Sequence, residues 1–563
     1  MRSPSVWRQP LRIFASAFVI VFLAITFIGA GATFTGGTVH QAHAQPEATE
    51  VDDGAEVEAG EAAEVAAEGE AADAPVSLAM ENNDTPLTAR LMSFFGIFGL
   101  IGIAWLLSNN RRAVDWKLVA MGVGIQMVFA VFVLKTSVGE QVFAAANAVV
   151  MQLLAFTEAG SRLLFGFDGQ LIQYFAFGVL PTIIFFSSLM TVLYHLGVMQ
   201  AVVRWVAWAM RRTMGTSGSE TLSAAANIFV GQTEAPLMIK PYVSTMTKSE
   251  LMAVMTGGFA TVAGGVLAAY VGFLRDVFPD IAGHLMAASV LSAPAALVVA
   301  KIMYPETEDS PTRGDVQLDV ESDDANVIDA AARGAGEGLT LALNVGAMLL
   351  AFVALVAMMN YLFALPSYVQ HGSALDRVVE QVEEAGLEIP AEVAAVCDPG
   401  TVREATGAGV ALEARAGCVD QIQAAVWVDA DPPGVTVWPA ITLEKIFGVL
   451  FFPIAFLMGV PLADCFLVGQ LLGTKMVINE FVAYDNLSRL LHDPSVTLHP
   501  RSMVIATYAL CGFANFGSIA IQIGGIGGIA PERRHDLAKL GIRAMIGGSL
   551  AAFMTATVAG ILV

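Results

Sequence analysis

Charged residues are scarce in this sequence. Asp, Glu, Lys and Arg make up 14% of its 563 residues, whereas soluble domains contain about 25%. The chain is therefore not an ordinary soluble domain. Basic residues are the scarcer kind, with 29 Lys and Arg against 51 Asp and Glu, so no nucleic-acid partner is expected.

Cysteine is also rare, with four in the chain. The sequence has no CxxC motif and no Cys/His cluster, which argues against a metal site built from these residues. Cys465 and Cys511 lie in apolar segments and are expected to be packing residues. Cys397 and Cys418 flank a polar stretch and could form a disulfide if that stretch lies outside the cytoplasm.

Hydrolase motifs are missing as well. The sequence contains neither HExxH nor GxSxG, and most of its eight histidines lie in loops or near the ends of apolar segments. An intramembrane hydrolase would need a nucleophile with a base, or a metal cluster. The sequence therefore predicts a protein that is not an enzyme.

Long apolar runs are abundant. The chain is 56% hydrophobic with a mean hydropathy of +0.65, and several runs reach the ~20 residues needed to cross a bilayer. The fold class predicted is an all-α polytopic membrane protein. The eight predicted spans are 91–107, 118–134, 172–198, 251–274, 284–302, 339–365, 503–523 and 541–562. Segments 142–165 and 204–215 are amphipathic and are predicted to be interfacial.

The N-terminal region has the order of an export signal. Arg2, Arg8 and Arg12 precede an apolar run, and AHAQ at 42–45 offers a small-residue cleavage pattern. Residues 1–44 are therefore a signal peptide or an N-terminal signal anchor. Residues 45–86 form an acidic linker, which is expected to be disordered and extracytoplasmic because it has almost no residues that build a core.

Basic residues in the short loops set the orientation. Arg111, Arg112 and Lys117 place the loop after the first span inside the cell. Counting onward, segment 304–338 is cytoplasmic, and the polar insertion 366–440 lies outside. The ends of the mature chain also lie outside, and the predicted location is the bacterial inner (plasma) membrane.

Two polar segments are too short to be spans. GQTEAP, at 231–236, and GTKMVINEFVAY, at 473–484, are each flanked by apolar stretches that cannot cross a bilayer alone. Each is predicted to be the tip of a re-entrant helical hairpin that is buried in protein rather than lipid. With the assigned orientation, the hairpins enter from opposite sides. This inverted repeat is typical of secondary transporters.

Glu234 and Glu480 fall in these two tips. An ionisable side chain inside a membrane is a functional hypothesis by default, although either carboxylate could instead only stabilise its tip. Thr261, Asn515 and Ser518 lie in Gly-rich spans that could unwind locally. Amides, hydroxyls and carboxylates without a basic cluster favour a neutral, polyhydroxylated or amide-bearing solute over a phosphate or carboxylate.

Three long motifs carry a resemblance to a known family. GQTEAPLMIKPYV, GTKMVINEFVAY and ALCGFANFGSIAIQIGG closely resemble the signature segments of the concentrative nucleoside transporter family. The resemblance runs from about residue 91 to the C-terminus, apart from the enlarged region 366–440. It implies eight spans and two hairpins in each protomer, a homotrimer, and elevator-type movement of a transport domain past a scaffold.

The resemblance also implies a nucleoside site. A Gln amide offers a donor and an acceptor that match the imide edge of uracil. A carboxylate can accept from both ribose hydroxyls, so a sugar lacking one would leave a buried charge under-satisfied. The nucleobase would be bound by Gln232, Thr233, Glu234 and Val266. The ribose would be bound by Glu480, Phe513, Asn515 and Ser518.

The coupling ion implied by the resemblance is sodium, with no other cofactor. The family's ligands would correspond to Asn227, Val230, Thr261 and Val262. Oxygen-only ligation suits a hard cation, and a proton remains the alternative. A nucleoside-gated sensor or channel could use the same pocket. Besides the nucleoside, the expected partners are membrane lipid and further copies of the chain.

The expected organisation places scaffold helices TM1 to TM3 at 87–200. An interfacial helix, the first hairpin, TM4 and TM5 follow at 201–303. The loop 304–338 leads to TM6 at 339–365. After the insertion, segment 441–563 holds an interfacial helix, the second hairpin, TM7 and TM8.

Overall fold

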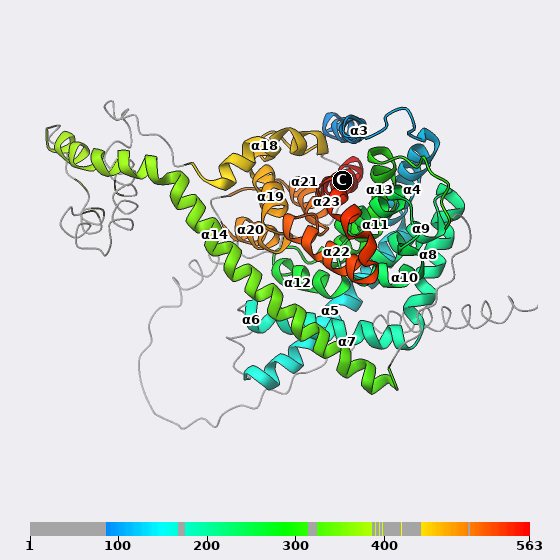
Figure 1. The fold of residues 1–563 in the computed structure, drawn as a ribbon. Helices are drawn as coiled ribbons and strands as arrows, with labels where there is room; N and C mark the ends of the chain where they lie inside the picture. Colours follow the sequence, from blue (N-terminus) through cyan, green and yellow to red (C-terminus); the bar gives the residue numbers. More distant parts are fainter. Residues whose placement is uncertain are drawn as a thin grey trace, which may run out of the picture.

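The computed structural model describes residues 86–166, 175–312, 324–384, 441–493 and 496–563, with a few isolated positions between 384 and 441. The expected signal, the acidic linker and most of the insertion 366–440 lie outside these residues. All regular secondary structure among the described residues is helical, as the composition predicts. Figure 1 shows the helices around a central group that contains α23, α21 and α11.

The first part of the chain forms long apolar helices. The described helices up to the first predicted hairpin are α3 (Leu87–Leu106), α4 (Trp116–Lys135), α5 (Ser137–Phe165), α6 (Phe175–Gly178), α7 (Leu180–His195) and α8 (Val198–Met214). Asp115 begins α4 because its carboxylate accepts hydrogen bonds from the main-chain N–H groups of Lys117 and Leu118. Gly215, with φ 70°, ends α8 in a left-handed conformation.

The first predicted hairpin and the helices after it are short and interrupted. They are α9 (Gly218–Asn227), η2 (Ala235–Ile239), α10 (Lys240–Val243), α11 (Lys248–Ala260), α12 (Gly264–Leu274) and α13 (Ile281–Met303). Capping boxes begin α9 and α11, through Ser217 with Glu220 and Thr247 with Glu250. Thr261 ends α11 in an extended conformation, so the span predicted at 251–274 is broken in its middle.

The second half repeats this order after the very long helix α14 (Val327–Glu384). Its helices are α18 (Leu443–Met458), α19 (Cys465–Val477), α20 (Glu480–His492), α21 (Pro500–Leu510), α22 (Phe516–Ile529), η3 (Pro531–Arg533) and α23 (Arg534–Leu562). Two packed short helices, a broken helix and a long helix thus follow one another in each half. The order agrees with the predicted repeat, and the re-entrant course of the short pairs stays a prediction.

Eight helical segments among the described residues are long and apolar enough to cross a membrane, and one of them, 248–274, includes the break between α11 and α12. Seven of them overlap predicted spans. The eighth is α5, for which the sequence predicted an interfacial position; that position stays a prediction. The predicted span 503–523 is not among the eight, because residues 511–515 separate α21 from α22.

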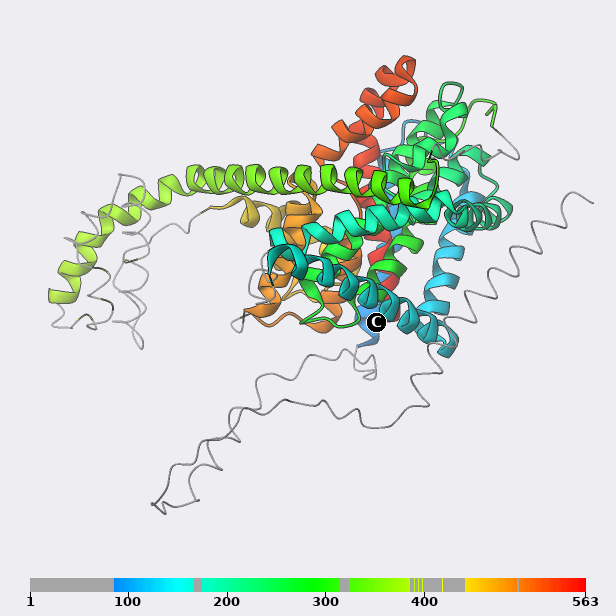
Figure 2. The same cartoon turned by 90° about the horizontal axis from the view of Figure 1, so that it is seen from below.

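One helix crosses two boundaries expected from the sequence. Residues 304–338 were expected as a cytoplasmic loop or amphipathic helix, followed by the span 339–365 and the insertion. The helix α14 begins at Val327, inside the first of these segments, and continues through the span to Glu384, over 58 residues. At 1.5 Å per residue it is about 87 Å long, and it extends away from the rest of the molecule in Figures 1 and 2.

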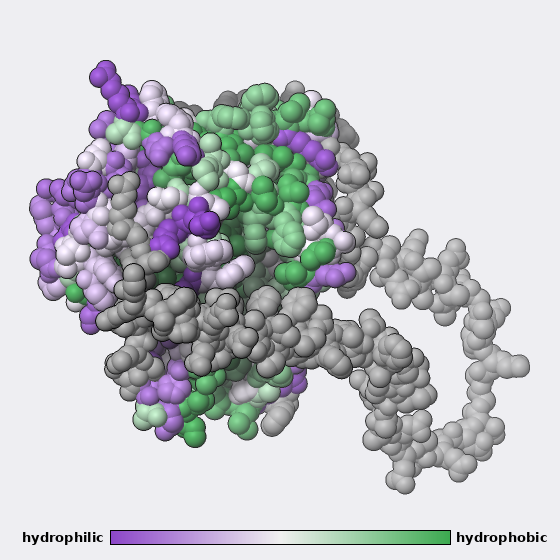
Figure 3. Space-filling model, turned by 90° about the vertical axis from the view of Figure 1, so that its right-hand side faces the viewer, coloured by the Kyte–Doolittle hydropathy of each residue, from purple (hydrophilic) through white to green (hydrophobic). Residues whose placement is uncertain are grey.

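The helices fall into two packing groups. The helix α7 packs mainly against α14, whereas α3 and α4 pack against α23 and α13. Large apolar side chains are exposed on the outer faces of α3, α4 and α14, including Phe95, Phe98, Val128, Leu343 and Leu350. Figure 3 shows one face with a broad apolar area beside a more polar one. Such faces suit contact with lipid or with another copy.

Candidate functional site

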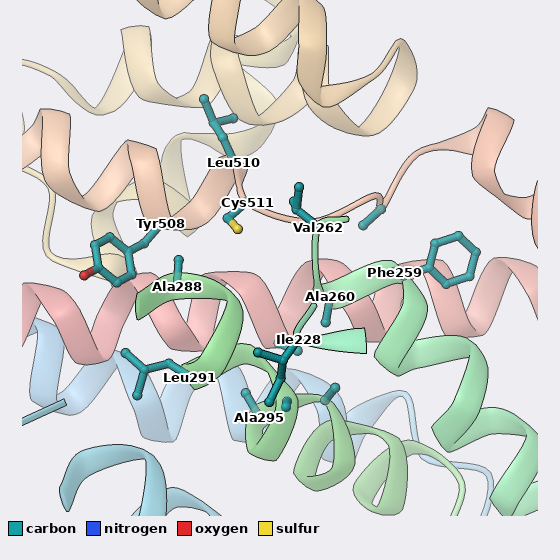
Figure 4. Close-up of a cluster of buried hydrophobic side chains, with 14 of the residues drawn as sticks. Ile228, Phe259, Ala260, Val262, Ala288, Leu291, Ala295, Tyr508, Leu510 and Cys511 are labelled. Carbon is teal, nitrogen blue, oxygen red and sulfur yellow. The ribbon is translucent and has the colours of Figure 1, made fainter. Parts of the chain in front are cut away.

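The site lies where two interrupted helices meet. The break after α11 contains Thr261 and Val262, and the break after α21 contains Cys511 and Gly512. Gly512 has φ 118°, and a Cβ there would lie 2.8 Å from the carbonyl oxygen of Ala260. Glycine permits this conformation and this close approach. Figure 4 shows Val262 and Cys511 side by side on the two non-helical segments.

Glu480 is the buried carboxylate of this site. It is the first residue of α20 and is 3% exposed. Asn479 caps this helix by accepting a hydrogen bond from the main-chain N–H of Val482. The Tyr270 hydroxyl donates to Glu480 Oε1 at 3.1 Å, and Asn515 Nδ2 donates to Oε2 at 2.9 Å. The helix N-terminus also favours a negative charge here.

Asn515 links this carboxylate to a second polar group. Its side-chain oxygen caps α22 by accepting from the Ser518 main-chain N–H at 2.8 Å. The Ser518 hydroxyl in turn accepts from Gln232 Nε2 at 3.1 Å, and Gln522 Nε2 donates to Gln232 Oε1 at 3.0 Å. The structure therefore brings Glu480, Asn515, Ser518 and Gln232 into one hydrogen-bonded series.

The remaining predicted solute residues are not members of this hydrogen-bonded series. Glu234 is exposed, unlike Glu480, and its carboxylate folds back over Gly231. Thr233 lies against Gly525 of α22, where a Cβ would come within 3.0 Å of its methyl group. Val266 is buried in α12, and Phe513 is half-buried in the second break. None of these four hydrogen-bonds to the Glu480 carboxylate among the described contacts.

The four predicted sodium ligands are all buried beside the first break. Asn227 ends α9, and its Nδ2 donates to the Ser223 carbonyl oxygen at 3.0 Å. Its Oδ1 is buried and has no hydrogen-bond partner among the described residues. Thr261 Oγ1 donates to the Gly257 carbonyl oxygen at 2.9 Å, which leaves its lone pairs available. An unpartnered buried amide oxygen and a hydroxyl with free lone pairs are oxygen ligands of the kind that suits a hard cation.

Three contact residues were missed by the sequence analysis. Tyr270 and Gln522 hold Glu480 and Gln232, and Lys475 is fully buried near the same breaks. Lys475 and Gln522 lie inside motifs quoted above, whereas Tyr270 lies in the predicted span 251–274. The signal was a polar side chain in an apolar run, but only the three-dimensional fold shows which partner each one reaches.

Two predictions concern groups outside the site. Cys397 and Cys418 are joined by a disulfide in the structure, and the insertion around them lies outside the described residues. No cluster of three or more His, Cys, Asp or Glu side chains able to hold a metal ion occurs in the described part of the chain.

A buried carboxylate between interrupted helices of a polytopic protein indicates a particular class of membrane protein. In secondary transporters, discontinuous helices place their ends and unwound carbonyls around a solute and its coupling ion. Intramembrane carboxylates otherwise are rare because burying them is unfavourable. The fold and the site are those of a secondary transporter.

Comparison with known sequences agrees with this class. Residues 95–168 match the profile described as Na+ dependent nucleoside transporter N-terminus, and 176–276 match one described as nucleoside recognition. Residues 284–382 and 411–560 match the profile of the Na+ dependent nucleoside transporter C-terminus. The chain belongs to the concentrative nucleoside transporter family.

Individual relatives cover most of this chain. An uncharacterized transporter of Haemophilus influenzae is 39% identical over 479 residues, which are 84% of this chain and 98% of that protein. Sodium/nucleoside cotransporter 1 of Mus musculus is 38% identical over 485 residues, again 84% of this chain. The match spans 64% of the mouse protein's own length.

Solved structures give the same result for the fold. CNTnw in an inward-facing substrate-bound state is 37% identical, with a TM-score of 0.65 over 84% of this chain and 98% of that one. A CNTnw variant in an outward-facing state gives a TM-score of 0.67 at 37% identity, over 85% and 98% of the two chains.

Proposed function

We propose that the protein imports nucleosides, with uridine as the representative substrate, by symport with sodium across the bacterial inner membrane. The relatives named sodium/nucleoside cotransporters support sodium and nucleosides as the transported species. The single observation that carries the proposal is the buried Glu480 carboxylate, held by Tyr270 and Asn515 at the start of α20.

The ribose is the natural partner of this carboxylate. Its two oxygens can accept from the 2′ and 3′ hydroxyls, and charge-assisted hydrogen bonds of this kind contribute about 1.5–3 kcal/mol each. Asn515 and Ser518 would complete the ribose contacts, with Phe513 packing nearby. A sugar without one hydroxyl would leave the buried charge under-satisfied, which gives selectivity for ribosides.

The nucleobase would contact the other end of the hydrogen-bonded series. The Gln232 amide forms hydrogen bonds with Ser518 and Gln522. It could rotate to pair with the imide edge of uracil. Thr233, Glu234 and Val266 would form the rest of the nucleobase site. Sodium would bind the oxygens of Asn227, Val230, Thr261 and Val262, next to the break that positions Val266.

The assembly would be a homotrimer whose protomers each move the site by an elevator motion. The exposed apolar face of α14 supports contact with another copy or with lipid. The mature termini and the insertion 366–440 would lie in the periplasm, consistent with a disulfide between Cys397 and Cys418.

The test is uptake of radiolabelled uridine into proteoliposomes under separate sodium and proton gradients. Accumulation driven by sodium alone is expected. Accumulation driven only by a proton gradient would show that the coupling ion is the proton and not sodium. If uridine binds but does not accumulate against a gradient, the protein would be a sensor or channel and not a symporter.

A further inference from the structure

Lys475 is a basic residue buried in the centre of the molecule. It lies in α19 and is 0% exposed. Its ammonium donates to the carbonyl oxygens of Ala509 at 2.8 Å and Cys511 at 3.4 Å, and it lies 5.9 Å from the centre of the Phe553 ring. A fully buried Lys is rare unless it is paired, so these contacts identify a place built for a cation.

That place is formed by two helix ends. The helix α19 ends at Val477 and α21 ends at Leu510, and Lys475 reaches the last carbonyls of α21 from α19. Carbonyl groups at a helix C-terminus lack helical partners and carry a partial negative charge. Glu480 begins the next helix, α20, directly after the segment that follows α19.

The first half of the chain has the same arrangement without a fixed cation. The helix α9 ends at Asn227 and α11 ends at Ala260. A Cβ on Gly257, in the last turn of α11, would lie 3.4 Å from Asn227 Nδ2. The residue that reaches across is therefore a neutral amide with an unpartnered oxygen. In both halves the first short helix approaches the C-terminal end of a broken helix.

We propose that Lys475 is a built-in cation that occupies, in the second half, the place that the coupling sodium ion occupies in the first. This inference rests on the proposed function. Each half would then have one positive charge between its two helix ends. In the first half this charge is the exchangeable sodium ion, and in the second half it is the ammonium group of Lys475. Transport would couple to a single sodium ion, and the Lys475 charge would offset that of Glu480, which binds the ribose.

The experiment compares the wild type with Lys475→Gln in proteoliposomes, using ²²Na⁺ and labelled uridine together. The wild type is expected to show a hyperbolic sodium dependence and one sodium per uridine. In Lys475→Gln a second sodium ion would enter the emptied place, so the dependence becomes sigmoidal and the ratio approaches two. The control is Thr474→Ala, which should behave as wild type. Among the described residues, the neighbouring Thr474 hydroxyl bonds only the Gln470 carbonyl of its own helix.

A Lys475→Gln variant that transports with an unchanged ratio and a hyperbolic dependence would overturn the inference. If the variant does not transport, its melting temperature is measured against sodium concentration. A larger sodium-dependent rise than in wild type supports the inference, and an equal rise overturns it. Absence of uridine transport by the wild type would instead reject the proposed function, and the melting measurement would still test Lys475.

Discussion

Gln232 and Ser518 are 286 residues apart in the sequence, yet the Gln232 amide donates to the Ser518 hydroxyl at 3.1 Å. Gln232 belongs to the turn after α9, and Ser518 lies in the first turn of α22. The contact therefore joins the interrupted segments of the two halves. It makes the polar centre of the molecule a product of both halves, so a substitution in either one should change solute binding.

Replacing Glu480 with Gln should abolish uridine uptake. The variant keeps the size of the side chain but removes the charge that accepts from Tyr270, Asn515 and the proposed ribose hydroxyls. Loss of charge-assisted bonds predicts binding that is weaker by about 100-fold or more. Uridine binding to the purified variant measures this. Asp485→Asn is the control, because Asp485 pairs with Arg489 on the same helix. Wild-type uptake by Glu480→Gln would remove Glu480 from the site.

Replacing Gly258 with Ala should weaken nucleoside binding through Gln232. The new Cβ would lie 2.7 Å from Gln522 Nε2 and 2.9 Å from Gln232 Cβ, so at least one of these side chains must move. We expect the uridine KM to rise by about tenfold, since roughly one hydrogen bond is lost. Gly524→Ala is the matched control because no atom of the described residues lies within 4 Å of its Cβ position. An unchanged KM for Gly258→Ala would show that Gln232 does not contact the solute.

Replacing Thr261 with Ala should weaken the response to sodium rather than to uridine. The substitution removes one proposed oxygen ligand and the hydrogen bond to Gly257. The sodium concentration for half-maximal uptake is expected to rise about tenfold. Thr261→Ser keeps the hydroxyl and should remain close to wild type. Equal sodium dependence in Thr261→Ala and Thr261→Ser would remove Thr261 from the ion site.

Replacing Arg501 with Met should destabilise the protein without a specific effect on the site. Its guanidinium donates to the carbonyl oxygens of Gly459, Val563 and Ala89 and to the Ser93 hydroxyl. Removing it leaves several buried acceptors unpaired, which costs about 3 kcal/mol or more. The melting temperature should fall by roughly 5 °C or more.

The control for this variant is Arg489→Met. Arg489 has 77% of its side chain exposed and pairs within its own helix, and such surface pairs contribute little to stability. An Arg501→Met variant that melts at the same temperature as Arg489→Met would contradict the structural role of Arg501.

The sequence predicted the centre of the site better than its surroundings. Glu480 and Asn515 were recognisable because polar side chains in apolar runs need a reason to be there. The partners Tyr270, Gln522 and Lys475 were not, since their roles depend on contacts between segments far apart in the chain. Of these, Tyr270 lies 210 residues from its partner Glu480.

Hydropathy alone also could not find where helices stop. The predicted span 503–523 is mostly apolar, yet Asn515 caps a new helix and Gly512 adopts a left-handed conformation between α21 and α22. A hydropathy average does not distinguish such a break from a continuous helix. The same limitation applies to α14, whose charged ends continue the helix beyond any hydrophobic segment.

Arg501 has a consequence for motion. It connects the beginning of α3, at Ala89 and Ser93, to the end of α18, at Gly459, and to its own helix α21. These three helix ends can separate only if buried hydrogen bonds break. In the proposed elevator motion they would therefore move together. Since α7 packs mainly on α14 instead, the boundary between the moving and stationary parts would then cross segment 87–200.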